Sequence, residues 1–380
     1  MNKTLVIIIL GLLVSVGCNR SDKEKNDQDP IIISIGAENH QERINYSQLF
    51  DRIRYIILDT NDDCLIGIVG KIVFYENQFY IFDVQQHIVF VFSETGQFLW
   101  KLDKRGNGPG EYAYLMDFDI HQNRLYVFDR RRQLLEYDLS GNFITHYTVT
   151  IPGTSYLQQN EFSYFYTCNM SSPDFGNYAL LIMDKEGKNF QNGIPVTQTN
   201  LINKCVNFNN SSVFCRYNNN IRFYMPFETN VYSIAADSIF VPYRIDIKNK
   251  NIPANYFERN TYEDLRNTSY AYGMNTFWEN DSYISFSMYF DQRGWDVLYT
   301  KNEAKPVYGT FFDDIAYCFP SFQHADNDFV IGFRLMNELH GEYAYAQEIK
   351  ESREGKIIEE IVQRTNEEDN PVLFICYLKK

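Results

Sequence analysis

The stretch from Lys104 to Tyr112 reads KRGNGPGEY and combines two cations, three glycines and an acid. Backbone N–H groups of a glycine-rich loop can form a concave nest for an anion, and neighbouring cations strengthen it. A ligand site in this loop would use five residues: Lys104, Arg105, Asn107, Glu111 and Tyr112. The alternative is that the glycines and Pro109 only carry the chain from one structural unit to the next.

The glycine spacing favours the turn over a nucleotide site. A dinucleotide fingerprint needs G-x-G-x-x-G at a strand-to-helix junction, because the helix N-terminus binds the pyrophosphate. Here Gly106, Gly108 and Gly110 are two residues apart, and a strand pattern follows them instead of a helix. No Lys-Ser or Lys-Thr pair of a P-loop follows either.

Other chemistry-bearing residues give weaker signals. Asp83 and Asp129 end equivalent apolar runs, which suggests a carboxylate pair. Because both lie at the same position of a repeat, one turn-capping role explains both, and we predict that role. The six histidines show no H-x-x-x-H or H-E-x-x-H spacing, and the chain has no G-x-S-x-G. We therefore predict no catalytic residue and no cofactor.

Seven cysteines are present, and one of them ends an apolar N-terminal run. Lys3 precedes the uncharged run from Leu5 to Val16, which is long enough for a signal peptide but too short to span a bilayer. The run ends in Ser15-Val16-Gly17-Cys18, which resembles a bacterial lipobox with Ser15 where leucine is usual. We predict a lipoprotein signal over 1–17, lipid on Cys18 and a polar tether over 18–30. An ordinary cleaved signal or an uncleaved anchor are the alternatives.

The other six cysteines have no regular spacing. Cys205 and Cys215 are closest in sequence and form the one disulfide that we predict in an oxidising compartment. Buried unpaired thiols are the alternative.

An internal repeat supplies the elements that position these residues. The segment from Phe74 can be laid over the segment from Ile120, with Asn77, Tyr80 and Asp83 matching residues 46 positions later. Each copy has short β-rich runs separated by Gly, Asn and Asp turns, which indicates antiparallel strands joined by hairpins. A period in the forties built from about four strands is typical of a propeller blade.

Later segments repeat this hairpin pattern at 221–234 and 280–309. We expect a short helix after Pro253 and another over the apolar positions 357, 358, 361 and 362. The final run 372–378 predicts a buried strand that pairs with an N-terminal strand and closes the ring. The sequence thus predicts one all-β domain over 31–380, a six-bladed β-propeller of four-stranded antiparallel blades with short inserted helices. Seven blades stay open.

The runs KIVFYENQFYIFD, GQFLWKLDKRGNGPGEY and NRLYVFD resemble the six-bladed β-propeller lipoproteins of the bacterial cell envelope, which are distantly similar to NHL-type propellers. The match extends to FYMPFETNVYSI and DNPVLFICYLK, so it covers most of the chain after residue 50. This resemblance implies a six-bladed fold and an envelope location, in the periplasm or on the outer membrane. It implies no catalytic residue.

The net charge limits the classes of partner that the protein can bind. The formal charge of −14 argues against nucleic-acid binding, which needs a basic surface to neutralise phosphates. We expect the protein to contact the membrane through its lipid anchor. The leading hypothesis is a non-catalytic binding or scaffold protein for a glycan, a peptide or an envelope protein. The rival is a propeller lyase or hydrolase with a divalent metal in the central channel, and fold alone does not decide between them.

Overall fold

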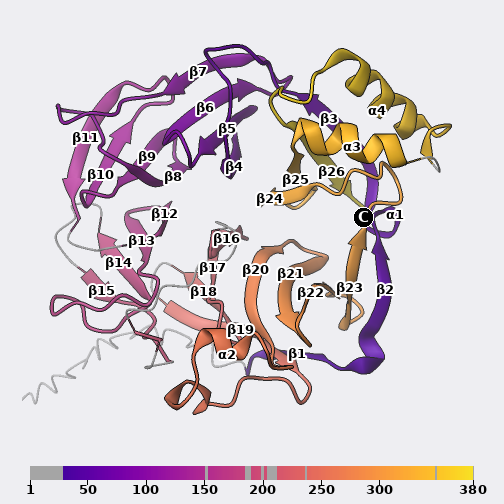
Figure 1. The fold of residues 1–380 in the computed structure, drawn as a ribbon. Helices are drawn as coiled ribbons and strands as arrows, with labels where there is room; N and C mark the ends of the chain where they lie inside the picture. The colour runs from indigo at the N-terminus through magenta and orange to yellow at the C-terminus, as the bar shows by residue number, and fades with distance from the viewer. Residues whose placement is uncertain are drawn as a thin grey trace, which may run out of the picture.

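The chain folds as a ring of six small sheets around a central axis, as predicted (Figure 1). The computed structural model describes residues 29–149, 153–184, 190–197, 201–202, 212–235, 238–346 and 349–379. Four sheets have four strands and two have five. The innermost strand of each blade is β4, β8, β12, β16, β20 or β24, and these strands contact one another around the axis.

The first three blades follow one another along the chain. Blade 1 contains β4 (Val69–Tyr75), β5 (Gln78–Asp83), β6 (Ile88–Ser93) and β7 (Phe98–Leu102). Blade 2 contains β8 (Leu115–His121), β9 (Arg124–Asp129), β10 (Gln133–Tyr137) and β11 (Phe143–Thr148). Blade 3 contains β12 (Ser155–Gln159), β13 (Phe162–Tyr166), β14 (Leu180–Asp184) and β15 (Phe190–Asn192). The first two blades are the two copies of the repeat.

The last three blades each take a strand from the N-terminal segment. Blade 4 contains β16 (Phe214–Tyr217), β17 (Asn220–Tyr224), β18 (Asn230–Ala235), β19 (Ser238–Ile247) and β1 (Ile31–Ile35). Blade 5 contains β20 (Tyr272–Glu279), β21 (Tyr283–Phe290), β22 (Arg293–Thr300), β23 (Lys305–Phe312) and β2 (His40–Asn45). Blade 6 contains β24 (Ser321–Ala325), β25 (Phe329–Arg334), β26 (Val372–Leu378) and β3 (Phe50–Ile57).

The ring closes as the sequence predicted. β26 pairs antiparallel with β3, from Val372 opposite Ile57 to Cys376 opposite Ile53. The sequence did not predict that β1 and β2 add parallel to the outer edges of blades 4 and 5. We call residues 31–57, which run past three blades in succession, the N-terminal belt.

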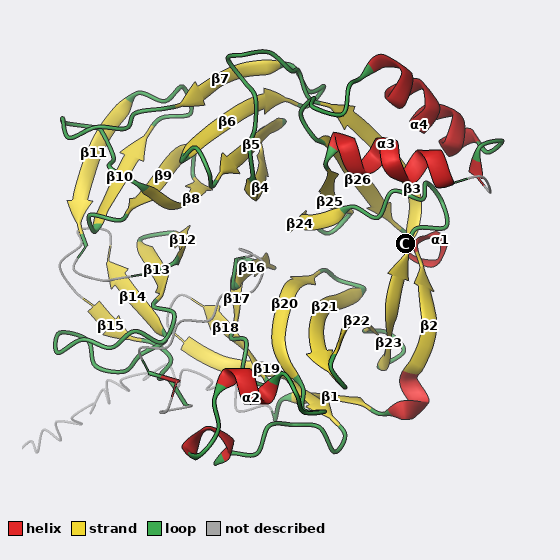
Figure 2. Cartoon of the chain, in the orientation of Figure 1, coloured by secondary structure: helices red, strands yellow, loops and turns green. Residues whose placement is uncertain are grey.

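Short helices lie at the periphery of the ring (Figure 2). Two of them, η3 (Tyr256–Glu258) and α2 (Tyr262–Leu265), fall in the helix predicted after Pro253. The predicted C-terminal helix is α4 (Arg353–Arg364), which Ser352 caps by accepting the Gly355 N–H. α3 (Met336–Tyr345), which also lies between β25 and β26, was not predicted. The remaining short helices in the described chain are η1 (Ala37–Asn39) and α1 (Tyr46–Leu49).

The core is distributed between the blades. Six clusters of buried apolar side chains each join two adjacent blades, so every blade packs against both of its neighbours. Phe and Tyr dominate the largest fully buried side chains, including Tyr80, Phe118 and Tyr156. The aromatic excess of the sequence is therefore used mainly to pack flat sheets face to face.

Candidate functional site

The glycine loop forms the crossover from β7 of blade 1 to β8 of blade 2, as predicted. The loop folds around the side chain of Glu111, whose Oε2 accepts a hydrogen bond of 2.7 Å from Gly108 N. A Cβ at Gly106 would lie 1.9 Å from the same oxygen, and Gly110 has a φ of +73°. Gly106 thus leaves room for the Glu111 carboxylate in this position, and Gly110 supplies a left-handed turn.

The other residues predicted for this loop make contacts within the protein. Arg105 Nε lies 3.0 Å from Asp103 Oδ1, and Lys104 Nζ lies 5.5 Å from the centre of the Tyr137 ring. Asn107 Oδ1 accepts a hydrogen bond from Arg131, and the buried Tyr112 hydroxyl lies 2.8 Å from Leu102 O. The structure brings all five residues together. The Glu111 carboxylate already accepts the Gly108 N–H, which an external anion in this loop would otherwise bind.

Asp83 and Asp129 are turn caps, as predicted. Both are fully buried. Asp83 accepts hydrogen bonds from the backbone N–H groups of Gly67 and Gln85, and Asp129 accepts them from Ala113 and Tyr114. In each blade the aspartate thus holds the segment that leads into the innermost strand.

The predicted disulfide between Cys205 and Cys215 is wrong, because Cys215 has a free thiol. Its side chain packs among apolar residues between blades 4, 5 and 6, and burial raises its pKa to about 12. Cys168 takes part in a disulfide instead. Closeness in sequence was the only ground for the predicted pair, and strand packing directs Cys215 elsewhere. Cys18 and Cys205 lie outside the described residues.

The strongest candidate site is the axial channel, which contains three cavities in series. The first, of about 200 Å³, lies at the end where the crossovers enter the innermost strands, and we call it the entry pocket. A narrower waist of about 120 Å³ shares Lys71 and Tyr224 with it. The third, of about 660 Å³, shares Arg216 and His324 with the waist and opens among the innermost hairpins, and we call it the vestibule.

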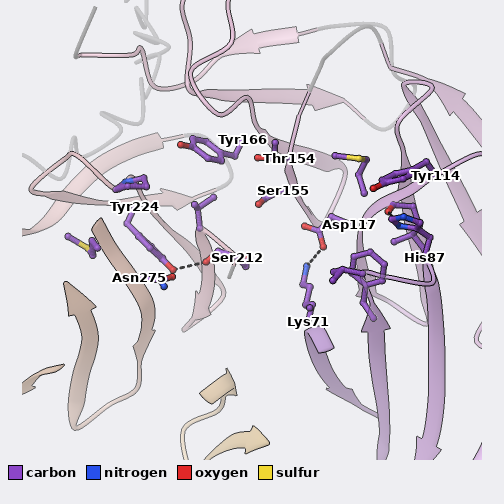
Figure 3. A pocket seen from close by; sticks show the side chains of 18 residues that line it. Lys71, His87, Tyr114, Asp117, Thr154, Ser155, Tyr166, Ser212, Tyr224 and Asn275 are labelled. Carbon is purple, nitrogen blue, oxygen red and sulfur yellow. Dashed lines mark hydrogen bonds and ion pairs between the residues drawn. The ribbon is translucent and has the colours of Figure 1, made fainter. Parts of the chain in front are cut away.

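An ion pair forms one wall of the entry pocket (Figure 3). Lys71 Nζ, on β4, donates to Asp117 Oδ1 at 2.9 Å and to Phe118 O at 2.7 Å, both on β8. Burial raises the pKa of Asp117 above its ordinary value, although Lys71 and two backbone N–H groups oppose this shift. The pair ties blade 1 to blade 2 at the axis.

Thr154, which lines the same pocket, carries a buried hydroxyl without a partner among the described residues. Thr154 Oγ1 is enclosed by protein atoms and makes no hydrogen bond within the described chain. Figure 3 shows Thr154 and Ser155 together on the segment that enters β12, near the Lys71–Asp117 pair. An unsatisfied buried polar atom costs free energy, so its presence at a cavity is a sign of a ligand or an ordered water.

The β8 strand carries a ladder of side-chain acceptors that the sequence analysis missed. Asp117, Asp119 and His121 alternate along one side of this strand. They accept hydrogen bonds from the backbone N–H groups of Tyr156 (2.7 Å) and Gln158 (2.8 Å) on β12 and of Asn160 (2.8 Å) just after it, respectively. The signal was the D-x-D-x-H alternation, which is unusual in a strand with a buried inner face.

At the waist, Arg216 on β16 reaches across the channel to Asp119. Burial favours the neutral acid, but Arg216 and Lys71 outweigh it, so the pKa of Asp119 lies below its ordinary value. Burial also lowers the pKa of His121, and it lowers that of His324 to about 4. Both imidazoles are therefore neutral at pH 7.

The vestibule has a different lining, rich in primary amides. Five of its residues carry one: Gln159, Asn160, Asn218, Asn219 and Asn327. Tyr217 lies among them, with Lys301 Nζ 4.0 Å from its ring centre. Glu279 is also present but is already paired with Arg222 and Lys301.

No group of three His, Cys, Asp or Glu side chains in the described ranges has the geometry to hold a metal ion. Helices long and apolar enough to cross a membrane are likewise not found among the described residues.

Comparison with known proteins identifies the family of the chain and two similar structures. The family model described as a domain of unknown function (DUF4934) matches residues 30–377. A crystal structure from Bacteroides fragilis, of a protein described by inference as exported, is 19% identical, with a TM-score of 0.75 over 92% of this chain and 100% of that chain. A DUF4221 family member from Bacteroides vulgatus is 10% identical, with a TM-score of 0.51 over 87% and 98% of the two chains. No curated protein matches the chain significantly.

Proposed function

The chain belongs to the DUF4934 family, and from this fold and its channel we propose that it is a binding protein for a hydroxyl-rich ligand, a single sugar residue or the end of a glycan. The observation that carries this proposal is the convergence of three unfilled hydrogen-bonding sites on the entry pocket. Catalysis is not needed to explain them.

Each of the three sites follows from counting donors and acceptors. The Lys71 ammonium has three N–H donors and uses two of them within the described chain. Among the described residues, Asp117 Oδ2 accepts only from Tyr156 N, which leaves a lone pair. Thr154 Oγ1 has no partner in the same part of the chain. Together they offer a donor, an acceptor and a hydroxyl that can be either, which is the set that a sugar hydroxyl pair matches.

The size and the apolar lining of the pocket agree with this ligand. Drug-sized ligands usually occupy about 300–1,000 Å³, so a cavity of about 200 Å³ suits one sugar ring. Phe82, Met116 and Met274 line the pocket and supply apolar surface for the C–H face of a ring.

The test is calorimetric titration of the domain with methyl glycosides of glucose, galactose, mannose and N-acetylglucosamine. We expect one of them to bind and Thr154→Val, which keeps the side-chain shape, to weaken that binding about 10-fold, the value of one good hydrogen bond. The variant should be no less stable than the wild type, because it removes an unsatisfied hydroxyl. Thr148→Val, at an exposed position on β11, is the matched control. Failure of all four glycosides, or equal binding by Thr154→Val, would refute the proposal.

We also propose that the protein works outside the cytoplasm on a lipid anchor at Cys18. The lipobox-like sequence supports this proposal, as does the structural similarity to the Bacteroides fragilis protein that is described by inference as exported. An anchored position would keep the channel close to glycans of the cell surface.

A further inference from the structure

We propose that the vestibule is a second binding site, at the opposite end of the channel, and that it takes an extended peptide through its backbone amides. At about 660 Å³ it is more than three times the size of the entry pocket. It lies within the usual range for ligand sites. This proposal does not depend on sugar binding.

The inference rests on asparagine side-chain amides that have no hydrogen-bond partner among the described residues. The side chains of Asn160, Asn218, Asn219 and Asn327 are exposed and make no hydrogen bond to any described residue. A primary amide presents a donor beside an acceptor, which is the complement of a peptide group. Four such groups around one cavity can pair with successive peptide units without selecting side chains.

Turn chemistry explains why asparagine is tolerated at some of these positions, but not why the amides surround a cavity. Asn218 and Asn219 form the two-residue loop between β16 and β17, with φ of +47° and +60°. This conformation favours Asn or Gly. The same loop in blade 1 is Glu76-Asn77, which does not line the vestibule.

Arg216 supplies a charged donor at the floor of the vestibule. It donates from Nη1 and Nη2 to Asp119, and from Nη2 to Gln158 O at 2.7 Å. Its Nε–H and second Nη1–H have no partner in the described chain, and the side chain is 40% exposed. Either donor can bind a peptide carbonyl oxygen. Because the two histidines are neutral, Arg216 is the one cation among the described residues that line the vestibule.

The experiment compares acetyl-pentaalanine amide with its backbone N-methylated analogue by calorimetry. We expect the peptide to bind and the analogue, which lacks amide N–H groups, to bind at least about 10-fold more weakly. Asn218→Gly/Asn219→Gly removes two amides while allowing the same turn, and should weaken peptide binding by a similar factor. Asn77→Gly, at the matching turn position in blade 1, is the control and should bind normally.

Three outcomes would overturn the proposal: no peptide binding at millimolar concentration, equal binding of the N-methylated analogue, or unchanged binding by the double glycine variant. Binding of diacetylchitobiose without binding of the peptide would also overturn it, because the amide would then be that of a sugar. Methyl glycoside binding at the entry pocket should persist in the double glycine variant, so the two proposals fail separately.

Discussion

His324 is a residue whose burial opposes its protonation. It lies on β24 where the waist meets the vestibule, and burial lowers its pKa from 6.5 to about 4. Arg216 lies nearby and adds to this shift, while Asp119 and Asp326 oppose it. In the unfolded chain the imidazole would regain its ordinary value near 6.5.

We therefore expect His324 to make the fold sensitive to mild acid. Between pH 6.5 and about 4 the unfolded chain binds a proton that the folded protein does not, so stability falls as the pH is lowered. The contribution should be roughly 1 to 3 kcal/mol, reduced because the side chain keeps some access to the channel. His324→Gln should lose less stability than the wild type when urea unfolding is measured at pH 7.5 and 4.5. His146→Gln, at an exposed position, reports any general effect of the replacement. If His324→Gln and the wild type lost the same free energy of unfolding between pH 7.5 and 4.5, His324 would not be the source of the acid sensitivity.

The roles of single residues could be predicted from the sequence where they depend on contacts with nearby residues of the chain. Asp83 and Asp129 were identified as caps because their matching positions in the repeat imply one shared role. The channel residues were missed, because Lys71 and Arg216 reach their partners across blades and neither lies near Asp117 or Asp119 in sequence. Thr154 has no distinctive sequence context at all.

At the scale of elements, β26 is the strand on which ring closure depends. It lies between β25 and β3, so it joins the C-terminal blade to the start of the chain. Asn370, just before it, accepts from Ile66 N at 2.8 Å and donates to Asp59 O and Cys64 O. Strand pairing and this amide together fasten blade 6 to the loop that enters blade 1.

Deletion of residues 371–380 should abolish the cooperative fold, because it leaves β25 and β3 without their common partner and exposes two sheet edges. Thermal unfolding monitored by near-ultraviolet circular dichroism is the measurement. Asn370→Ala provides a graded comparison and should cost about 2 to 4 kcal/mol, since it leaves buried backbone groups unsatisfied. A truncated protein with the melting temperature of the wild type would show that the ring does not need this closure.

Elements with a strong local pattern were predictable, and elements defined by distant partners were not. The hairpins of blades 1 and 2 and the amphipathic α4 follow from strand and helix periodicity. β1 and β2 have no such periodic pattern. They become strands by pairing with the free edges of β19 and β23, which lie more than 200 residues away in sequence.

At the scale of the whole molecule, the lipid anchor proposed at Cys18 would hold the propeller at the membrane surface. Cys18→Ala should move the protein from the detergent-rich to the aqueous phase of Triton X-114, because one modified residue holds the lipid. The melting temperature should not change, since the belt begins only at Ile31. Retention of the variant in the detergent phase would mean that the apolar N-terminal run, and not Cys18, holds the protein at the membrane.

The N-terminal belt also constrains the order in which the molecule can assemble. Its three strands emerge first from any machine that delivers the chain N-terminus first, yet their partners β19, β23 and β26 emerge much later, β26 among the final residues. Such long sequence separation slows folding, because distant ends must meet before their contacts stabilise them. Blades 1 to 3 can form as the chain appears, whereas blade 6 waits for the final residues. Closure of the ring is thus a late event. Until their partners appear, the three belt strands, including the isoleucine-rich β1, are unpaired, and a holding chaperone would need to shield them.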